Sequence, residues 1–225
     1  MTSQLLGAPI TTGDSRENII RATAEKVLRL ATETNLQALV VSGGATTPLV
    51  LRLIARLWTL DFLPTLVVSD ERHSGSDEDR NDLQLREMVT STRFADCKIE
   101  SPRYGRDAFE SARAWSLRLQ SLPRPDVAIL SMADDGHIAG LFPTVDQVPV
   151  SDVVIVCEAS PKPPSTRISL SSSYLKTIPH RLVTVSGENK LSALSHVANG
   201  DELPTTLVRP TEWFIESSLW SELRH

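Results

Sequence analysis

The chain has 225 residues, of which 40% are hydrophobic, 23% are charged and only 5% are aromatic. This mixture excludes a wholly disordered chain and predicts a core filled mainly by aliphatic side chains. Lys and Arg number 23 against 28 Asp and Glu, which gives a formal net charge of −5. Without an overall positive charge, the protein is not expected to bind nucleic acid or an anionic membrane, although a few convergent cations could still bind a small anion.

The cysteines and the length of the apolar runs exclude further classes of protein. The two cysteines, Cys97 and Cys157, lie far apart in the sequence, which excludes a cysteine-only zinc site and a disulfide-rich scaffold and is typical of a reducing compartment. No secretory signal is predicted at the start of the chain, and no stretch approaches the ~18 apolar residues that a membrane span needs. We therefore expect a cytoplasmic protein that does not associate with a membrane.

Hydrophobic periodicity predicts helices and short strands in alternation along the chain. Apolar residues at helical spacing predict helices at residues 15–33, 49–58, 81–89, 107–119 and 188–198. Short apolar runs predict strands at residues 38–41, 66–68, 126–130, 153–156, 182–185 and 213–215, with one helix and no strand before the first of them. This alternation is typical of an α/β protein with a mostly parallel, doubly wound sheet flanked by helices, which we expect to form a single domain over residues 1–225.

Ligands of parallel sheets bind outside the carboxyl ends of the strands, and polar segments follow several of the predicted strands. The first is residues 42–48 (SGGATTP), where Gly43 and Gly44 let the backbone approach a ligand. Thr46 and Thr47 add hydroxyl groups at the start of a helix, whose free N–H groups favour an anion. The segment is neither a P-loop nor a dinucleotide-binding G-x-G-x-x-G, and an ordinary tight turn is the alternative interpretation.

Three charged residues, Asp70, Glu71 and Arg72, come directly after the strand predicted at residues 66–68. An arginine at this edge of the sheet could hold a phosphate or an oxyanion while the neighbouring carboxylates position it. A solvated surface loop is the alternative, and it is the commoner origin of so short a charged run.

A histidine lies in the loop after the strand at residues 126–130, within residues 134–143 (DDGHIAGLFP). Histidine is a common general base near neutral pH, so His137 is a candidate for that role, and Asp135, two residues earlier, can orient it. The alternative is a surface histidine in a loop, which is the interpretation we give to His73, His180, His196 and His225. No second histidine stands at ligand spacing from His137, so no metal site is predicted.

Two further cations follow later strands, Arg167 in STRISL and Lys190 in GENK. Each alone is typical of a surface cation. Lys190 is predicted to lie in the first turn of a helix, where the helix dipole disfavours a positive charge. This placement indicates that an anion is to join it.

Taken together and in this order, the four segments resemble the glucosamine-6-phosphate isomerase/6-phosphogluconolactonase family, from about Val40 to Lys190. The specific part is DER followed by DGH-x-A-x-LFP, because the glycine loop alone is common. The sequence departs from the lactonase pattern at Ser131, Ala133, Ile138 and Arg80, and its glycine loop is one residue longer than usual. The family fold implied by the resemblance is an α/β domain around a mostly parallel sheet.

The resemblance implies hydrolysis of 6-phospho-D-glucono-1,5-lactone to 6-phosphogluconate, without a metal or an organic cofactor. In this interpretation His137 is the general base, Asp135 orients it, and Arg72 lies near the developing oxyanion or the phosphate. The substrate and its phosphate are expected to be held by the remaining candidates, Gly43, Gly44, Thr46, Thr47, Asp70, Arg167 and Lys190. The expected partner is the small sugar-phosphate lactone, and the protein is expected to be a monomer or a homodimer.

Two alternatives remain open at this stage. The first is a sugar-phosphate isomerase or deaminase of the same family, which uses a glutamate in an Asn-Glu-Pro ending where this chain has Leu141-Phe142-Pro143. The second is a sugar-phosphate-sensing domain without catalysis. Such regulators normally carry a helix-turn-helix, and the single helix predicted before the first strand is too little for that module.

Overall fold

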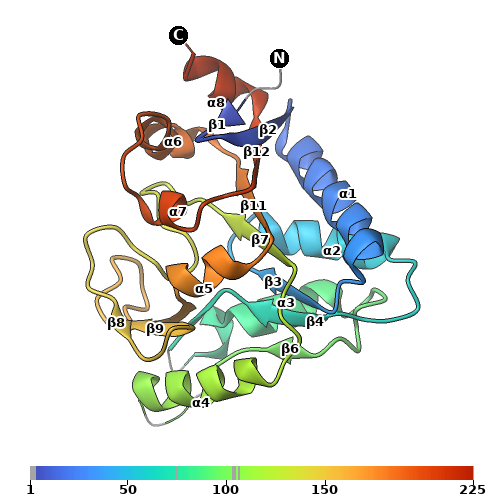
Figure 1. The fold of residues 1–225 in the computed structure, drawn as a ribbon, viewed down its shortest axis with the longest axis vertical. Helices are drawn as coiled ribbons and strands as arrows, with labels where there is room; N and C mark the ends of the chain where they lie inside the picture. Colours follow the sequence, from blue (N-terminus) through green and yellow to red (C-terminus); the bar gives the residue numbers. More distant parts are fainter. Residues whose placement is uncertain (1–3, 74–75, 103–104, 106, 225) are drawn as a thin grey trace.

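The computed structural model describes residues 4–73, 76–102, 105 and 107–224, and its centre is a sheet of eight strands (Figure 1). The strands lie in the spatial order β1-β2-β12-β11-β7-β3-β4-β6, and all neighbours are parallel except β1 and β2. The predicted α/β class with a mostly parallel sheet is therefore confirmed. In spatial order the strands are β1 Gln4–Leu5, β2 Ala8–Gly13, β12 Glu212–Glu216, β11 His180–Val185, β7 Val127–Ser131, β3 Ala38–Val41, β4 Thr65–Val68 and β6 Ile99–Glu100.

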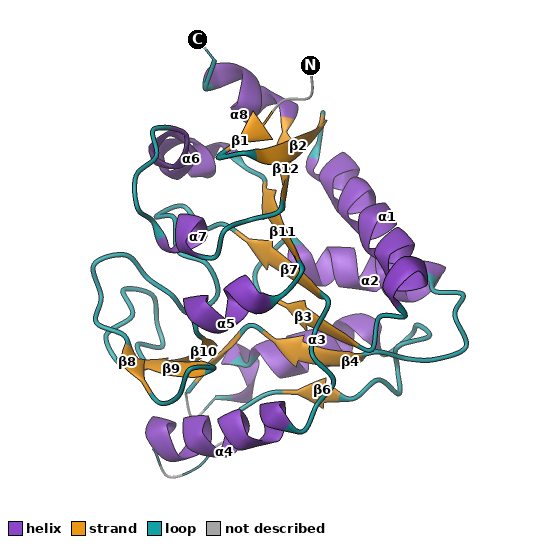
Figure 2. Ribbon diagram, in the orientation of Figure 1, coloured by secondary structure: helices purple, strands orange, loops and turns teal. Residues whose placement is uncertain are grey.

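Helices flank the sheet on both sides. In Figure 2, α5 and α7 lie in front of the central strands, whereas α2 and α3 lie behind them, and α2 packs against both α1 and α3. Within the described residues, none of the helices has the length and apolar character needed to span a membrane. The helices are α1 Arg16–Thr34, α2 Thr47–Leu57, α3 Asn81–Val89, α4 Ala108–Gln120, α5 Ser172–Thr177, α6 Leu191–Ala198, α7 Pro204–Leu207 and α8 Ser217–Glu222, with short 3-10 helices η1 Asp77–Asp79 and η2 Glu188–Lys190.

The central strands are apolar from end to end because both faces of the sheet are covered. All four residues of β3 are inaccessible to solvent, and so are the first four of β7. A strand buried on both faces needs an uninterrupted apolar run rather than alternation. The runs that predicted these strands are therefore the direct signature of their position in the middle of the sheet.

Strand β2 precedes α1, so the prediction of one helix and no strand before β3 is wrong. β2 lies beside β12 and runs parallel to it, with Thr11 opposite Phe214 and Thr12 opposite Ile215. Its sequence, APITTG, is only partly buried, and it contains a proline, which demotes a strand pattern. Such a segment carries little of the hydrophobic signal by which the other strands were predicted.

A second sheet of four strands, in the order β5-β10-β9-β8, is antiparallel throughout. Residues 70–72, for which a solvated loop was one interpretation, form its strand β5. The strand predicted at residues 153–156 also belongs to this sheet rather than to the parallel one. An apolar run indicates a buried strand but not its partner, and partner choice decides the sheet. The strands are β5 Asp70–Arg72, β10 Arg167–Leu170, β9 Val154–Cys157 and β8 Val148–Pro149.

Candidate active site

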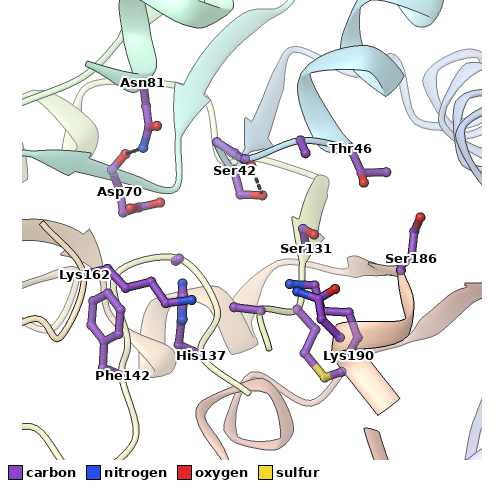
Figure 3. Close-up of a pocket in the computed structure, with 18 of the residues that line it drawn as sticks. Ser42, Thr46, Asp70, Asn81, Ser131, His137, Phe142, Lys162, Ser186 and Lys190 are labelled. Atoms are coloured by element: carbon purple, nitrogen blue, oxygen red, sulfur yellow. Dashed lines mark hydrogen bonds between the residues drawn. The ribbon is translucent and has the colours of Figure 1, made fainter. Parts of the chain in front are cut away.

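A cavity of about 740 Å³ opens at the carboxyl edge of the large sheet (Figure 3). Its walls come from the segments that follow β2, β3, β4, β7, β11 and β12, together with β5, β10 and the loop before β10. Most of the residues predicted for the site line it, namely Gly43, Gly44, Thr46, Asp70, Arg72, His137, Arg167 and Lys190. The structure thus brings segments far apart in sequence to one place, where they can act on one ligand.

His137 and Asp135 form a hydrogen-bonded pair at one side of the cavity. The Nδ1 atom of His137 lies 2.6 Å from Oδ1 of Asp135, and the backbone N–H of His137 donates to the same oxygen at 3.0 Å. The imidazole also packs on Phe142, with ring centroids 4.5 Å apart. Because Nδ1 is bound to the carboxylate, Nε2 is the ring nitrogen left for a substrate or a water, and no described residue bonds to it.

The charge of Asp135 is stabilised by this arrangement. Burial raises the pKa of the Asp135 carboxyl, but the hydrogen bonds from the ring and the backbone of His137 outweigh that effect and hold the pKa well below its ordinary value. Asp135 is therefore ionised throughout the physiological pH range. An ionised carboxylate fixes the tautomer of its histidine with the proton on Nδ1, which makes Nε2 the basic nitrogen.

The loop that carries His137 is anchored by α7. Gly136 has a φ of +80°, and a Cβ at this position would lie 2.7 Å from Cδ1 of Leu203. The carbonyl of Gly136 accepts a hydrogen bond from the hydroxyl of Thr205 at 2.7 Å. Both the conformation and the close packing require glycine here, so the D-G-H spacing has a structural reason as well as a chemical one.

The glycine loop after β3 is held by its second threonine. Thr47 is fully buried, and its hydroxyl donates to the carbonyls of Ser42 at 2.6 Å and Gly43 at 2.8 Å. Thr47 does not line the cavity, so the prediction that it holds the phosphate is not supported by its position: its hydroxyl is used to close the loop. The hydroxyl of Thr46, by contrast, lies on the cavity wall at the start of α2.

Arg72 and Arg167 are brought together by antiparallel pairing, since they lie opposite each other in β5 and β10. Nη1 of Arg72 donates to the carbonyl of Asp79 at 2.7 Å. Arg167 is only 4% exposed; its Nη2 donates to the carbonyls of Lys162 and Pro163, and its buried Nη1 has no partner among the described residues. Burial lowers the pKa of Arg167, and the charge of Asp70 partly offsets this.

Glu71 is the charged residue of β5 that does not line the cavity. Its Oε1 accepts the backbone N–H groups of Arg72 at 2.8 Å and Asn81 at 2.7 Å, and its Oε2 accepts that of Asp82 at 2.9 Å. Desolvation raises the pKa of Glu71 to about 7 in spite of these three bonds. Glu71 therefore joins β5 to the first turn of α3 and is a structural neighbour of the site.

Lys190 lies at the end of η2, directly before α6, as the sequence predicted for a first helical turn. The Gly187 turn that carries it is held by Glu216, whose carboxylate accepts bonds from the Ser186 hydroxyl and the Gly187 N–H. Burial lowers the pKa of Lys190; the charges of Asp134 and Asp135 oppose this effect, and those of Lys162 and Arg16 add to it.

Several cavity residues were not among the sequence candidates, and they include Arg16, Asn81, Lys162, Ser186 and Glu216. Ser186 and Glu216 end or follow predicted strands, so the rule that led to the other segments could have found them. Asn81 is the first residue of α3 and is held at the cavity by its bond to the carbonyl of Asp70 in β5. Lys162 lies in the proline-rich loop before β10, and Arg16 follows the unpredicted β2. Within the described residues no cluster of three or more His, Cys, Asp or Glu side chains is close enough to hold a metal ion.

Comparison with known proteins agrees with this geometry. The model of the family of glucosamine-6-phosphate isomerases/6-phosphogluconolactonase matches residues 14–220. Over 188 residues the chain is 27% identical to a 6-phosphogluconolactonase of Xylella fastidiosa, with 79% of this chain and 78% of that protein covered. Over 114 residues it is 32% identical to a probable 6-phosphogluconolactonase 2 of Oryza sativa subsp. indica, with 45% of this chain and 41% of that protein covered, so the match spans less than half of the plant protein.

The fold is also similar to solved structures of 6-phosphogluconolactonases. A crystal structure of a 6-phosphogluconolactonase from Shewanella baltica superposes with a TM-score of 0.80 at 22% identity, covering 96% of this chain and all of that one. A second, from Thermotoga maritima, gives a TM-score of 0.77 at 21% identity over 92% of this chain and 98% of that one. From the match of the family model over residues 14–220, the chain belongs to the glucosamine-6-phosphate isomerase/6-phosphogluconolactonase family.

Proposed function

We propose that this protein hydrolyses 6-phospho-D-glucono-1,5-lactone to 6-phosphogluconate. The observation that carries the proposal is the Asp135–His137 pair, whose free Nε2 faces a cavity lined by Arg72, Arg167 and Lys190. A general base beside several cations suits an uncharged ester attached to an anionic group. Membership of the family, and relatives named 6-phosphogluconolactonase, support the same assignment.

In the proposed reaction, Nε2 of His137 removes a proton from a water molecule as the water oxygen attacks the carbonyl carbon of the lactone. The tetrahedral intermediate carries a negative charge on the former carbonyl oxygen, which Arg72 stabilises. The bond between that carbon and the ring oxygen then breaks, and His137 returns its proton to the ring oxygen. Asp135 stabilises the imidazolium between the two steps.

Binding of the phosphate places the lactone for this attack. We assign the phosphate to Gly44 and Thr46 at the start of α2 and to Lys190, which lies across the cavity from Thr46 in Figure 3. We assign Arg167 and Asp70 to the wall formed by β5 and β10, which also carries Arg72. Interactions with a group remote from the ester hold the carbonyl near His137 and so contribute to the rate.

The isomerase alternative requires a glutamate in the loop after the histidine, and this chain has Phe142 at that position. The side chain packed on His137 is Phe142, an apolar ring. Ring opening and proton shuttling by a glutamate at this point of the loop are therefore not part of the proposal.

His137→Ala tests the function directly. Loss of the general base is expected to lower the enzymatic rate by ~10²–10⁴-fold while the melting temperature stays close to that of the wild type. The lactone is generated in situ by glucose-6-phosphate dehydrogenase, and acid release above the spontaneous rate is followed.

A second histidine provides a matched control. His196 also pairs with a carboxylate, Asp201, at 2.6 Å, but it lies outside the cavity. His196→Ala should keep full activity. A wild type without activity on this lactone would contradict the function, and a His137→Ala variant with more than half of the wild-type rate would contradict the role of His137.

A further inference from the structure

Arg16 is the first residue of α1, and its side chain reaches across to the start of α2. Nε of Arg16 donates to the hydroxyl of Thr46 at 3.4 Å, and the residue lines the cavity. No described carboxylate lies within ion-pair distance of its guanidinium, and no described residue bonds to Nη1 or Nη2. Two donors of a permanent cation are thus left facing the cavity.

The placement of Arg16 is unfavourable unless an anion is bound. The N-terminus of a helix carries partial positive charge, so a cation in the first turn is repelled by the helix dipole. Lys190, the N-cap residue of α6, also lies at a helix start; Asp134 and Asp135 favour its charge, whereas Lys162 and Arg16 are close enough to repel it. Arg16 lies beside Thr46, the N-cap residue of α2, and Lys190 faces Thr46 across the cavity (Figure 3). An anion between them would relieve all of these repulsions at once.

Glu216, one of the acidic residues that line the cavity, has other partners. Glu216 lines the cavity, but its carboxylate accepts hydrogen bonds from Ser186 and Gly187 and makes no ion pair with Arg16. Arg16 is therefore not explained as a partner of Glu216. The hydrogen bond from Nε to Thr46 fixes the orientation of the guanidinium group. Its two terminal nitrogens can then donate to two oxygens of one ligand.

We propose that Arg16 binds the phosphate of the substrate together with Thr46 and Lys190, and that it makes the site selective for a phosphorylated lactone over an uncharged one. This inference rests on the proposed function, since it names the group that grips the anionic end of that substrate. It adds a residue from the β2–α1 connection to a site otherwise built from the middle of the sheet.

Arg16→Gln tests the assignment on two substrates. On the phosphorylated lactone kcat/KM should fall by at least ten-fold, mainly through KM, whereas on unphosphorylated gluconolactone it should change less than two-fold. Arg16→Lys should recover part of the loss, because it restores the charge without the fork. Arg21 is an exposed arginine five residues further along α1, so Arg21→Gln is the matched control and should behave as the wild type on both substrates.

Calorimetric titration with inorganic phosphate separates this inference from the proposed function, because it needs no turnover. The wild type and Arg21→Gln should bind phosphate, and Arg16→Gln should bind it at least ten-fold more weakly with an unchanged melting temperature. Wild-type protein that binds phosphate but does not hydrolyse the lactone would refute the function and leave the role of Arg16 supported. Equal losses on the two substrates, unchanged phosphate affinity in Arg16→Gln, or no phosphate binding by the wild type would each overturn the inference.

Discussion

Along β5 the charged side chains divide between the two sides of the strand. Asp70 and Arg72 line the cavity, whereas Glu71 between them turns to the start of α3 and accepts N–H groups there. This is the alternation that a strand imposes on successive residues. The sequence could indicate that the charged run is functional, but it could not indicate which members face the substrate, because a loop imposes no such alternation.

At the scale of one residue, Arg72→Lys is expected to lower kcat/KM on the phosphorylated lactone by at least ~10-fold, about 1.4 kcal/mol of transition-state stabilisation. A planar guanidinium can bond to the carbonyl of Asp79 and to a ligand at the same time, whereas an ammonium group lacks this fork. Steady-state kinetics and a thermal melt measure the effect.

Arg86→Lys is the control for that substitution, since Arg86 also donates to a backbone carbonyl, that of Ala95, but lies away from the cavity. It should leave the kinetics unchanged. Near-normal kinetics in Arg72→Lys would reduce Arg72 to a surface charge, and a large fall in melting temperature would make its role structural.

Glu71 makes a prediction about stability and pH. Burial raises its pKa to about 7 in the folded state, above its ordinary value of 4.5. Between these two pH values the folded protein retains a proton that the unfolded chain has lost, so this group's contribution to the free energy of unfolding falls as pH rises from about 4.5 to about 7. The excess stability of the wild type over Glu71→Gln should therefore be smaller at pH ~8 than at pH ~5.

Urea denaturation of both proteins at the two pH values measures this difference. Glu78→Gln, an exposed neighbour in η1, is the control and should show no such dependence on pH. A difference that grows with pH would mean that the three N–H donors, rather than burial, determine the charge state of Glu71.

At the scale of elements, the glycine loop and α3 are in van der Waals contact, and this contact requires Gly43. A Cβ at this position would lie 2.3 Å from Oδ1 of Asn81, whose Nδ2 donates to the carbonyl of Asp70 at 2.9 Å. Gly43→Ala is expected to lower the free energy of unfolding by ~1–3 kcal/mol, because the crowded amide must move.

A double-mutant cycle tests this cause. In Gly43→Ala/Asn81→Ala the amide that the new methyl group meets is absent, so the combined loss of stability should be smaller than the sum of the two single losses. Additive losses in urea denaturation would show that the contact between the loop and α3 is not the origin of the effect.

The elements that the sequence predicted well are those whose burial is uniform. β3, β4 and β7 are apolar runs in the middle of the sheet, and α1 and α4 present a regular apolar stripe, so their patterns report their surroundings directly. β2 is partly exposed, and its pairing with a strand far along the chain cannot be seen in its own residues. The second sheet could not be predicted for the same reason, since pairing is a property of two segments.

At the scale of the whole molecule, the site follows from the parallel sheet. The carboxyl ends of six strands meet at one edge, so segments that are predicted to follow those strands are predicted to meet as well. That reasoning brought Gly44, Arg72, His137 and Lys190 together. The reasoning could not include Arg16, because the strand that precedes Arg16 was not predicted. It assigned Thr47 to a ligand because the sequence does not distinguish a hydroxyl that closes a loop from one that faces a substrate.

The position of β12 has a consequence for how the protein is made. β12 lies between β2 and β11, so β2 has no parallel partner in the sheet until β12 is present, and Thr11 of β2 and Glu212 of β12, which share a hydrogen bond, are 201 positions apart. During synthesis on the ribosome, the edge of β2 that faces β12 therefore stays unpaired until nearly all of the described chain has been made. Helix α1 can form early and packs on α2, but its packing on β12 is possible only when that strand is present. Completion of this side of the sheet thus belongs to a late stage of folding, and such distant pairing is typical of slow folding steps.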